Sequence, residues 1–199
     1  MCTDSGLMSC NTVEESVERA IQGGVSVVQL REKEASSREL FELAKRVKRV
    51  TDKYDVPLII NDRLDICLAV DAAGVHLGQT DLPCSEARRI LGAEKIIGVS
   101  AATPEEAAKA QSDGADYLGV GAVFATSTKT NTRPVTAETI RAIRSAVDIP
   151  FVVIGGVNSE NISGLHGLGI NGAAVISAII SQPDITAAAR KMRQAAERL

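Results

Sequence analysis

The strongest constraint on the fold is an alternation of short apolar runs with helix-period runs, repeated eight times along 199 residues. In one such unit, the apolar run 25–30 precedes a Ser36-x-x-Glu39 capping box and a helical apolar face over residues 40–50. The apolar runs are continuous, which is typical of strands buried on both faces of a parallel sheet. The pattern predicts one α/β domain over residues 1–199, a closed (β/α)8 TIM barrel, with a doubly wound sheet as the second possibility.

The expected elements follow from the same periodicity. A second capping box, Thr12-x-x-Glu15, begins the first helix, and Pro104 fits the first position of a helix opened by Thr103. Strands are expected at residues 1–4, 25–30, 58–60, 74–77, 95–100, 116–121, 150–154 and 173–176. Helices are expected near residues 13–21, 37–50, 63–70, 85–91, 104–112, 137–146, 158–168 and 184–199.

Polar residues follow the expected strands. In a TIM barrel the active site lies at the carboxyl ends of the strands, so these residues are the candidates for function. They comprise residues 29–33, 61–62, 79–81, Ser100, 126–129, 155–156 and 176–177. Connecting segments alone would not require so many charged and hydroxyl side chains at one rim.

Two aspartates at this rim suit a divalent metal. Asp62 follows the strand 58–60 and Asp81 follows the strand 74–77. If those strands are parallel neighbours, both carboxylates lie at the same edge, where they could hold Mg²⁺ together with a substrate diphosphate. The alternative is structural: Asp62 would cap the helix that begins near Arg63, and Asp81 would cap a turn before Pro83.

Further rim residues suit phosphate. Gly155-Gly156 and Ser177 occupy the last two strand-to-helix loops, where such barrels commonly hold a phosphate on backbone N–H groups. Thr126, Ser127, Thr128 and Lys129 offer hydroxyl donors and an ammonium, although the same composition fits a solvated loop. Arg31 and Lys33 add positive charge, unless they only pair with Glu32 or Glu34. One diphosphate site and one monophosphate site imply two substrates.

The two histidines do not suggest an acid and base pair. His76 falls within an expected strand, where it could line the site or only pack, and His166 is expected at a helix end or on the surface. A reaction in which Mg²⁺ stabilises a departing diphosphate needs no strong protein base.

Composition excludes several classes of protein. The 25 acidic and 22 basic residues are interspersed and aromatic residues make up 3%, so neither a nucleic-acid surface nor a base-stacking platform is expected. No run is long enough to span a membrane, and Cys2, Cys10, Cys67 and Cys84 lack metal-type spacing. A cytoplasmic protein with reduced thiols, monomeric or oligomeric, is expected.

The chain resembles the thiamine-phosphate synthase family, also called thiamine-phosphate pyrophosphorylase. The resemblance covers nearly the whole chain in the family's order, and the motifs together are highly specific. They are VVQLREK (27–33), LIINDRLD (58–65), AAGVHLGQTDLP (72–83), IIGVS (96–100), GADYLGVGAVFATSTK (114–129), VVIGGV (152–157) and GAAVISAI (172–179).

The resemblance implies a transferase that joins a hydroxymethylpyrimidine diphosphate to a thiazole phosphate, giving thiamine phosphate and diphosphate. In the family mechanism diphosphate departs first, and the thiazole nitrogen then attacks the pyrimidine-methyl cation. The resemblance further implies one Mg²⁺ ion per subunit on Asp62 and Asp81, and catalytic roles for Arg31, Lys33, Ser100 and Lys129. Substrate contacts are implied for Gln29, Arg31, Lys33, Asn61, Ser100 and Lys129 on the pyrimidine side, and for Thr126, Thr128, Gly156, Ile176 and Ser177 on the thiazole side. Leu30, Glu32 and Ser127 are further expected substrate contacts, assigned to neither side.

One departure concerns the first strand. Family members carry a fuller apolar strand before the residues that match Thr3-Asp4, whereas only Met1-Cys2 precede them here. A short or truncated first strand is therefore expected, with more effect on barrel closure and stability than on the diphosphate site.

Two rival functions fit the same fold. A thiazole tautomerase would use a general base and no metal, and a non-catalytic sensor would only bind a phosphate ligand. Asp62 and Asp81, together with Arg31, Lys33 and Lys129, favour the synthase.

Overall fold

A computed structural model describes residues 1–125 and 134–199. The chain divides into two compact units, which are described in turn. The first unit comprises Met1–His76 and Ile176–Arg193, and the second comprises Leu77–Val175 and Gln194–Leu199.

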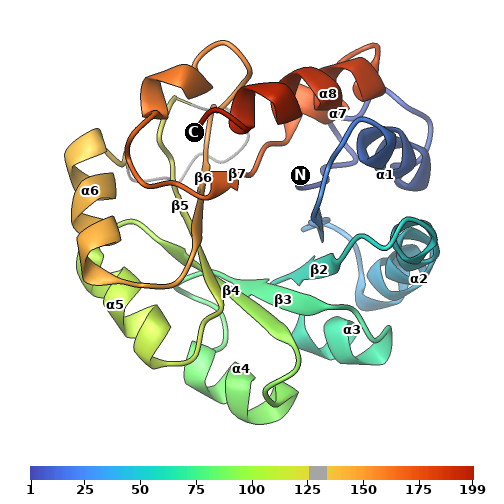
Figure 1. Cartoon of the computed structure of the whole chain (residues 1–199). Coiled ribbons are helices and arrows are strands. Elements are labelled where there is room, and N and C mark those ends of the chain that lie inside the picture. Colours follow the sequence, from blue (N-terminus) through green and yellow to red (C-terminus); the bar gives the residue numbers. More distant parts are fainter. Residues whose placement is uncertain (126–133) are drawn as a thin grey trace. The chain divides into compact units, whose positions relative to one another are not determined.

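The first unit is built from parallel strands and the helices that connect them (Figure 1). Strand β1 pairs with β2 and β2 pairs with β3, both in parallel, so that Leu30 lies opposite Ile60 and Asn61 lies opposite His76. Its elements are α1 (Val13–Gln22), β1 (Val28–Leu30), α2 (Ser37–Lys53), β2 (Leu58–Asn61), α3 (Leu64–Ala69), the start of β3 (Gly74–Leu77), α7 (Ser177–Ile180) and most of α8 (Ile185–Ala196).

Capping explains where the first two helices begin. The Ser36 hydroxyl accepts the Glu39 N–H and the Glu39 carboxylate accepts the Ser36 N–H, which confirms the predicted capping box of α2. Thr12 caps α1 by accepting the Glu15 N–H, but the Glu15 carboxylate pairs with Arg19 at 2.6 Å. The capping box predicted for α1 is therefore only half formed.

The segment before α1 pairs with β1 as a strand would. An isolated parallel bridge joins Cys2 to Gln29, whose N–H donates to the Met1 carbonyl at 2.8 Å. The Thr3 N–H in turn donates to the Gln29 carbonyl at 2.9 Å. Within residues 1–125 and 134–199 there are thus seven strands and one bridge, and the eighth strand expected at residues 1–4 is reduced to that bridge.

The second unit contains four parallel strands, with α4, α5 and α6 along their outer side (Figure 1). Thr103 caps α5 by accepting the Glu106 N–H, and Pro104 occupies its first turn, as predicted. The elements are the end of β3, α4 (Cys84–Leu91), β4 (Ile96–Ala101), α5 (Pro104–Ser112), β5 (Tyr117–Gly121), α6 (Ala137–Ala146), β6 (Phe151–Ile154), the 3-10 helix η1 (Ile162–Leu165) and β7 (Gly172–Ala173).

The helix predicted at residues 158–168 is wrong, since only the short 3-10 helix η1 forms there. The Asn158 side chain accepts the N–H groups of Glu160 and Asn161, which favours a local turn over a helix. Gly167 has a φ of 74°, which an α-helix cannot contain. The strand predicted at residues 173–176 is likewise reduced to the two residues of β7.

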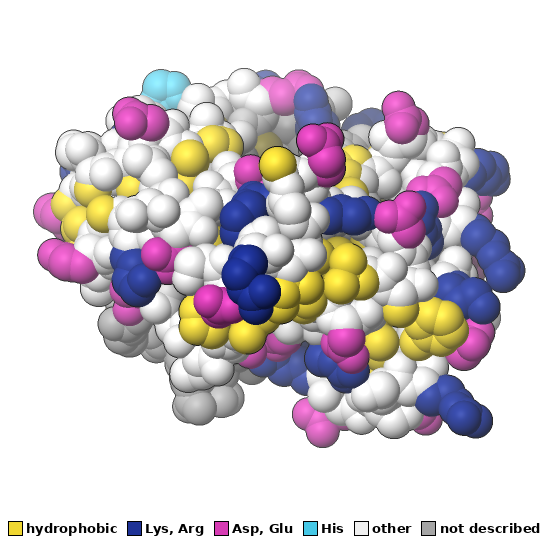
Figure 2. All heavy atoms as spheres, turned by 90° about the horizontal axis from the view of Figure 1, so that it is seen from below, with side chains coloured by type: hydrophobic (Ala, Val, Ile, Leu, Met, Phe, Trp, Pro, Cys, Tyr) yellow, Lys and Arg dark blue, Asp and Glu magenta, His cyan; other side chains and the backbone are white. Residues whose placement is uncertain are grey.

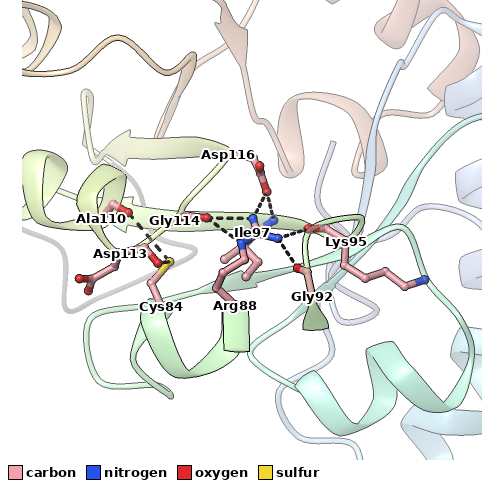
Figure 3. Close-up of polar contacts among 9 residues, drawn as sticks. All are labelled: Cys84, Arg88, Gly92, Lys95, Ile97, Ala110, Asp113, Gly114 and Asp116. Carbon is pink, nitrogen blue, oxygen red and sulfur yellow. Dashed lines mark hydrogen bonds and ion pairs between the residues drawn. The ribbon is translucent and has the colours of Figure 1, made fainter. Parts of the chain in front are cut away.

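Arg88 fixes the amino-terminal ends of β4 and β5 (Figure 3). Its guanidinium donates to the carbonyls of Gly114 at 2.8 Å, Gly92 at 2.7 Å and Lys95 at 2.8 Å. It also pairs with Asp116 at 2.5 Å, and the same Asp116 oxygen accepts the Ile97 N–H at 2.7 Å. One side chain thus fixes two strand starts at the rim opposite the strand ends.

Strand order decides between the two predicted architectures. The seven strands lie in the order β1-β2-β3-β4-β5-β6-β7, each beside its sequence neighbour. A doubly wound sheet would reverse direction at a switch point, whereas a TIM-type fold adds strands in sequence. The fold is therefore of the TIM-barrel-like parallel α/β class.

The surface carries charges of both signs. On the face shown in Figure 2, basic and acidic side chains are interspersed. The exposed large hydrophobic residues are Leu7, Val27, Leu68, Leu82 and Ile90. Of the helices in the described part of the chain, none is long and apolar enough to cross a bilayer.

Candidate functional site

The residues after β1 are held by the segment that precedes α1. The Arg31 N–H donates to the Thr3 hydroxyl oxygen at 2.9 Å, and Arg31 Nη1 lies 3.4 Å from Asp4 Oδ2. Both charged side chains are largely covered, with 16% of Arg31 and 25% of Asp4 exposed. The first residues of the chain therefore contact one of the cations predicted to bind diphosphate, more directly than the sequence suggested.

The other residues of the predicted β1 set have distinct environments. Gln29 is half-buried within β1, and the Leu30 side chain is buried in the core. One Glu32 carboxylate oxygen accepts the Thr3 hydroxyl at 2.8 Å, and the other accepts the Ser5 N–H at 3.1 Å. The carboxylate of Glu32 is thus engaged by the amino-terminal segment.

Lys33 and Asp62, which follow β1 and β2, lie close together although they are far apart in the sequence. Lys33 Nζ lies 3.5 Å from Asp62 Oδ2. Asp62 adopts the left-handed backbone conformation, with a φ of 62°, and its N–H donates to the His76 carbonyl at 2.8 Å. The predicted parallel pairing of the two strands is confirmed by Asn61 opposite His76.

Asp62 does not cap the following helix. The N-cap of α3 is Arg63, and no side-chain cap bond forms there. Arg63 donates instead to Asp65 at 2.5 and 2.9 Å, and these bonds hold the pKa of Asp65 below its ordinary value. Asp62 is therefore not the N-cap residue of α3.

Asp81 does close a turn, as its structural alternative predicted. Its Oδ2 accepts the Gly78 N–H at 2.6 Å, and its N–H donates to the Gly78 carbonyl at 3.3 Å. A carboxylate has two oxygens with about four lone-pair sites, so one turn bond leaves acceptor capacity for a cation. In the same loop, Gln79 Nε2 donates to the Ser100 carbonyl at 2.7 Å and thereby fixes the end of β4.

The backbone at the two glycines after β6 leaves no room for a side chain. Gly155 and Gly156 have φ values of 95° and 65°. A Cβ on Gly156 would lie 2.4 Å from the Ala125 carbonyl oxygen, and the Gly156 carbonyl accepts Asn161 Nδ2 at 2.9 Å. Only glycine fits this close approach of two backbone segments.

Of the remaining predicted residues, two lie at the start of the short helix α7 and four lie outside the residues that the structure describes. Ile176 is the N-cap of α7 and Ser177 is its first residue. Thr126, Ser127, Thr128 and Lys129 lie outside the described residues.

The donors fit a hard divalent ion that also binds substrate oxygens. Outside residues 126–133, no group of three or more His, Cys, Asp or Glu side chains is arranged to hold a metal by itself. Mg²⁺ is commonly held by one or two carboxylates plus substrate phosphates and water, so each of the Asp62 and Asp81 carboxylates is a chemically suitable ligand. These aspartates follow β2 and β3, which are paired neighbours.

Sequence reasoning gave no role to Thr3 and Asp4 at the end of the first apolar run. It listed Gln79 among the residues that follow the strands but assigned it no contact. Only their position could have identified these residues, because Thr3, Asp4 and Gln79 each follow an apolar run, as the selected site residues do.

Comparisons with known proteins agree over the full chain. A family model described as thiamine monophosphate synthase matches residues 1–179. The thiamine-phosphate synthase of Ruminiclostridium cellulolyticum is 57% identical over 96% of this chain and 91% of its own, and that of Clostridium botulinum is 52% identical over 100% and 93%. The solved structure of thiamine phosphate pyrophosphorylase from Pyrococcus furiosus covers 98% of this chain and 93% of its own, with a TM-score of 0.90 and 40% identity.

Proposed function

The chain belongs to the thiamine monophosphate synthase family, and from this premise we propose how its residues carry out the reaction. Its function is that of a thiamine-phosphate synthase, a transferase of thiamine biosynthesis. The substrates we propose are a pyrimidine diphosphate and a thiazole phosphate. They react within a single closed (β/α)8 domain formed by residues 1–199.

The pyrimidine diphosphate binds at the ends of β1, β2 and β4 in this proposal. Arg31 and Lys33 supply the positive charge, and the half-buried Gln29 supplies an amide beside them. Arginine and lysine bind phosphate oxygens through charge-assisted hydrogen bonds, which are about twice as strong as neutral ones. The full set is Gln29, Leu30, Arg31, Glu32, Lys33, Asn61, Ser100 and Lys129.

Asp62 and Asp81 would hold one Mg²⁺ ion. The support is their position after the paired strands β2 and β3, together with Arg63, rather than Asp62, as the N-cap residue of α3. When bound, Mg²⁺ acts as a Lewis acid that stabilises negative charge on the diphosphate oxygens.

The protein's own cations assist the departure of diphosphate. As the bond between the pyrimidine methylene carbon and the diphosphate oxygen breaks, its electron pair moves to that oxygen, beside Arg31 and Lys33. The thiazole nitrogen then donates its lone pair to the methylene carbon, and no proton is transferred in either step. This accounts for a site built from cations and carboxylates rather than from a histidine base.

The thiazole phosphate binds at the ends of the last strands in this proposal. The proposal is supported by the glycine turn at Gly156 and by Ser177 at the start of α7, two kinds of position where backbone N–H groups can donate to phosphate oxygens. Thr126, Ser127, Thr128 and Ile176 complete the proposed set. This loop chemistry is separate from that of the diphosphate site, as two substrates require.

The observation that carries the proposal is the Lys33–Asp62 pair, because it combines a diphosphate-binding cation with a metal-binding carboxylate at adjacent strand ends. We expect purified protein to release diphosphate and form thiamine phosphate only when both substrates and Mg²⁺ are present. EDTA should abolish the reaction, and excess Mg²⁺ should restore it.

Two variants and a matched control make this test specific. Asp62→Ala and Asp81→Ala should lose activity while circular dichroism and the unfolding midpoint remain near those of the parent protein. Asp52→Ala is the control, since the Asp52 carboxylate pairs with Lys48 on the surface of α2. Turnover without a divalent ion, or tautomerisation of the thiazole in place of diphosphate release, would contradict the proposal. Binding of both phosphates by folded protein without turnover would favour a sensor.

A further inference from the structure

We propose that Asp4 is a positioning residue that orients the Arg31 guanidinium toward the leaving diphosphate. This inference rests on the proposed role of Arg31 in diphosphate binding. The amino-terminal segment would then contribute to catalysis through Asp4, in addition to its pairing with β1 through Cys2.

The Asp4–Arg31 pair is partly shielded from water. Its atoms Oδ2 and Nη1 lie 3.4 Å apart, and the two side chains are largely covered. An exposed pair of long side chains contributes little, because solvent screens the charges and side-chain entropy opposes a fixed geometry. Partial burial reduces that screening, so the contact restricts the rotamers of Arg31 more than a surface pair would.

Backbone hydrogen bonds hold Asp4 in place independently of its contact with Arg31. Its other carboxylate oxygen, Oδ1, accepts the Gly6 N–H at 3.2 Å, and its carbonyl accepts the Leu7 N–H at 3.1 Å. Aspartate closes turns in this way, with its side chain bonded to a backbone N–H two residues on. The turn over residues 4–7 therefore sets the direction of Oδ2.

Thr3 and Glu32 lock the same segment to the end of β1. The Thr3 hydroxyl accepts the Arg31 N–H at 2.9 Å and donates to Glu32 at 2.8 Å. Glu32 returns to the segment through the Ser5 N–H at 3.1 Å. The backbone of Arg31 and the carboxylate that faces its side chain are thus fixed by one continuous set of bonds.

This arrangement leaves Arg31 able to bind substrate. A guanidinium has five N–H donors, and the contact with Asp4 uses one nitrogen, Nη1. The remaining donors are presented in a fixed plane, which suits a phosphate with two parallel acceptor oxygens. Orientation of a charged group before the reaction lowers the barrier without further reorganisation.

The sharpest variant is Asp4→Asn. Asparagine keeps the Oδ1 acceptor for the Gly6 N–H, but it places an amide NH2 where Oδ2 now faces Arg31. We expect kcat/KM for the pyrimidine diphosphate to fall by about 10- to 100-fold, as for other residues that orient a binding group. The KM for the thiazole phosphate and the unfolding midpoint should stay within about twofold and a few degrees of the parent values.

A double-mutant cycle with Arg31→Lys separates positioning from general damage. If Asp4 acts through Arg31, Asp4→Asn should reduce kcat/KM by less than about threefold in the Arg31→Lys background, because the planar guanidinium is already absent. The affinity for inorganic diphosphate with Mg²⁺, measured by calorimetry, should show the same non-additivity. Asp52→Asn is the matched control for loss of one carboxylate charge from a helix of the same unit.

Three outcomes would overturn the inference. They are an unchanged kcat/KM in Asp4→Asn, an equal loss in both backgrounds, or an equal rise in KM for both substrates. Each of these presupposes an active parent enzyme. An inactive parent protein would instead contradict the proposed function, so the two failures are distinguishable.

Discussion

The Lys33 ammonium and the Asp62 carboxylate lie 3.5 Å apart, which joins the first residues after β1 to the first residue after β2. If Asp62 binds Mg²⁺ as proposed, the Lys33 ammonium and the metal ion would compete for the same carboxylate, and a bound diphosphate would supply negative charge for both cations.

This competition predicts opposite effects of Lys33→Met on metal affinity and on catalysis. Without substrate, binding of Mn²⁺ should tighten by about 1.4- to fivefold, which corresponds to the roughly 0.2–1 kcal/mol of an exposed ion pair. Turnover should fall by about 10²- to 10³-fold, because a group that stabilises the departing charge is lost. Calorimetry measures the metal affinity and steady-state kinetics measure the turnover.

The control is Lys53→Met, which removes a lysine that pairs with Glu18 on α1. Weaker metal binding in Lys33→Met would contradict the expected competition.

Substitution of Gln79, which bonds the end of β4, should reduce activity less than substitution of Lys33. Its Nε2 donates to the Ser100 carbonyl at 2.7 Å, and Gln79→Glu replaces this donor by an acceptor of the same shape. The KM for the pyrimidine diphosphate should rise by about fivefold, since one hydrogen bond contributes on the order of 1 kcal/mol. Steady-state kinetics with each substrate varied in turn checks this. A rise confined to the thiazole phosphate would show that Ser100 does not contact the pyrimidine.

The sequence was informative where chemistry and position coincide. Asp62 and Lys33 could be selected because charged residues directly after buried strands have few structural reasons to be there, and the structure brings them together. The Ser36 capping box and the start of α5 at Pro104 were predictable because both depend on local bonds.

Long-range partners could not be predicted in the same way. The contact between Asp4 and Arg31 depends on how the first segment pairs with β1, and no spacing in the sequence encodes it. The false helix at residues 158–168 had the opposite cause. Its apolar period was suitable, but the Asn158 side chain and the positive φ of Gly167 favour turns that the period does not reveal.

Arg88 predicts a change in stability without a change in chemistry. Arg88→Ala removes the donor to the Gly114, Gly92 and Lys95 carbonyls and the partner of Asp116. The free energy of unfolding should fall by about 2–3 kcal/mol, because partly buried acceptors lose their bonds. Urea unfolding measures this loss.

A neighbouring arginine supplies the control for that experiment. In the described part of the chain Arg89 forms an ion pair with Glu86, and both side chains are exposed. Arg89→Ala should therefore change the free energy of unfolding by less than about 0.5 kcal/mol. The kcat of folded Arg88→Ala should equal that of the parent, since Arg88 lies at the strand starts; a large loss of kcat would contradict this division.

The contact between α1 and α2 predicts part of the acid sensitivity of the fold. Glu18 accepts Lys53 Nζ at 2.7 Å and the Tyr54 hydroxyl at 2.8 Å, which lowers the pKa of Glu18 from its ordinary value of 4.5. A carboxyl with a lowered pKa stabilises the folded state above pH 4.5, and this stabilisation is lost as the pH falls through the lowered pKa. Lys53→Met should therefore reduce the difference in urea midpoint between about pH 6 and about pH 3. These two pH values lie above and below the ordinary carboxyl pKa of about 4. Lys45→Met, on the same helix, should not.

Burial of the cysteines predicts selective labelling of the native protein. Burial raises the pKa of the Cys84 thiol, with a further contribution from the Asp113 carboxylate, and burial likewise raises the pKa of Cys2. Because the thiolate is the reactive form, both should react slowly with DTNB, as should the buried Cys67, whereas the partly exposed Cys10 should react first. Cys10→Ser should therefore remove the fast phase of DTNB reaction at pH values near 8, and urea should expose the other three thiols. A fast phase that persists in Cys10→Ser would mean that α4 opens readily enough to uncover Cys84, which would also contradict the stability attributed to Arg88 on the same helix.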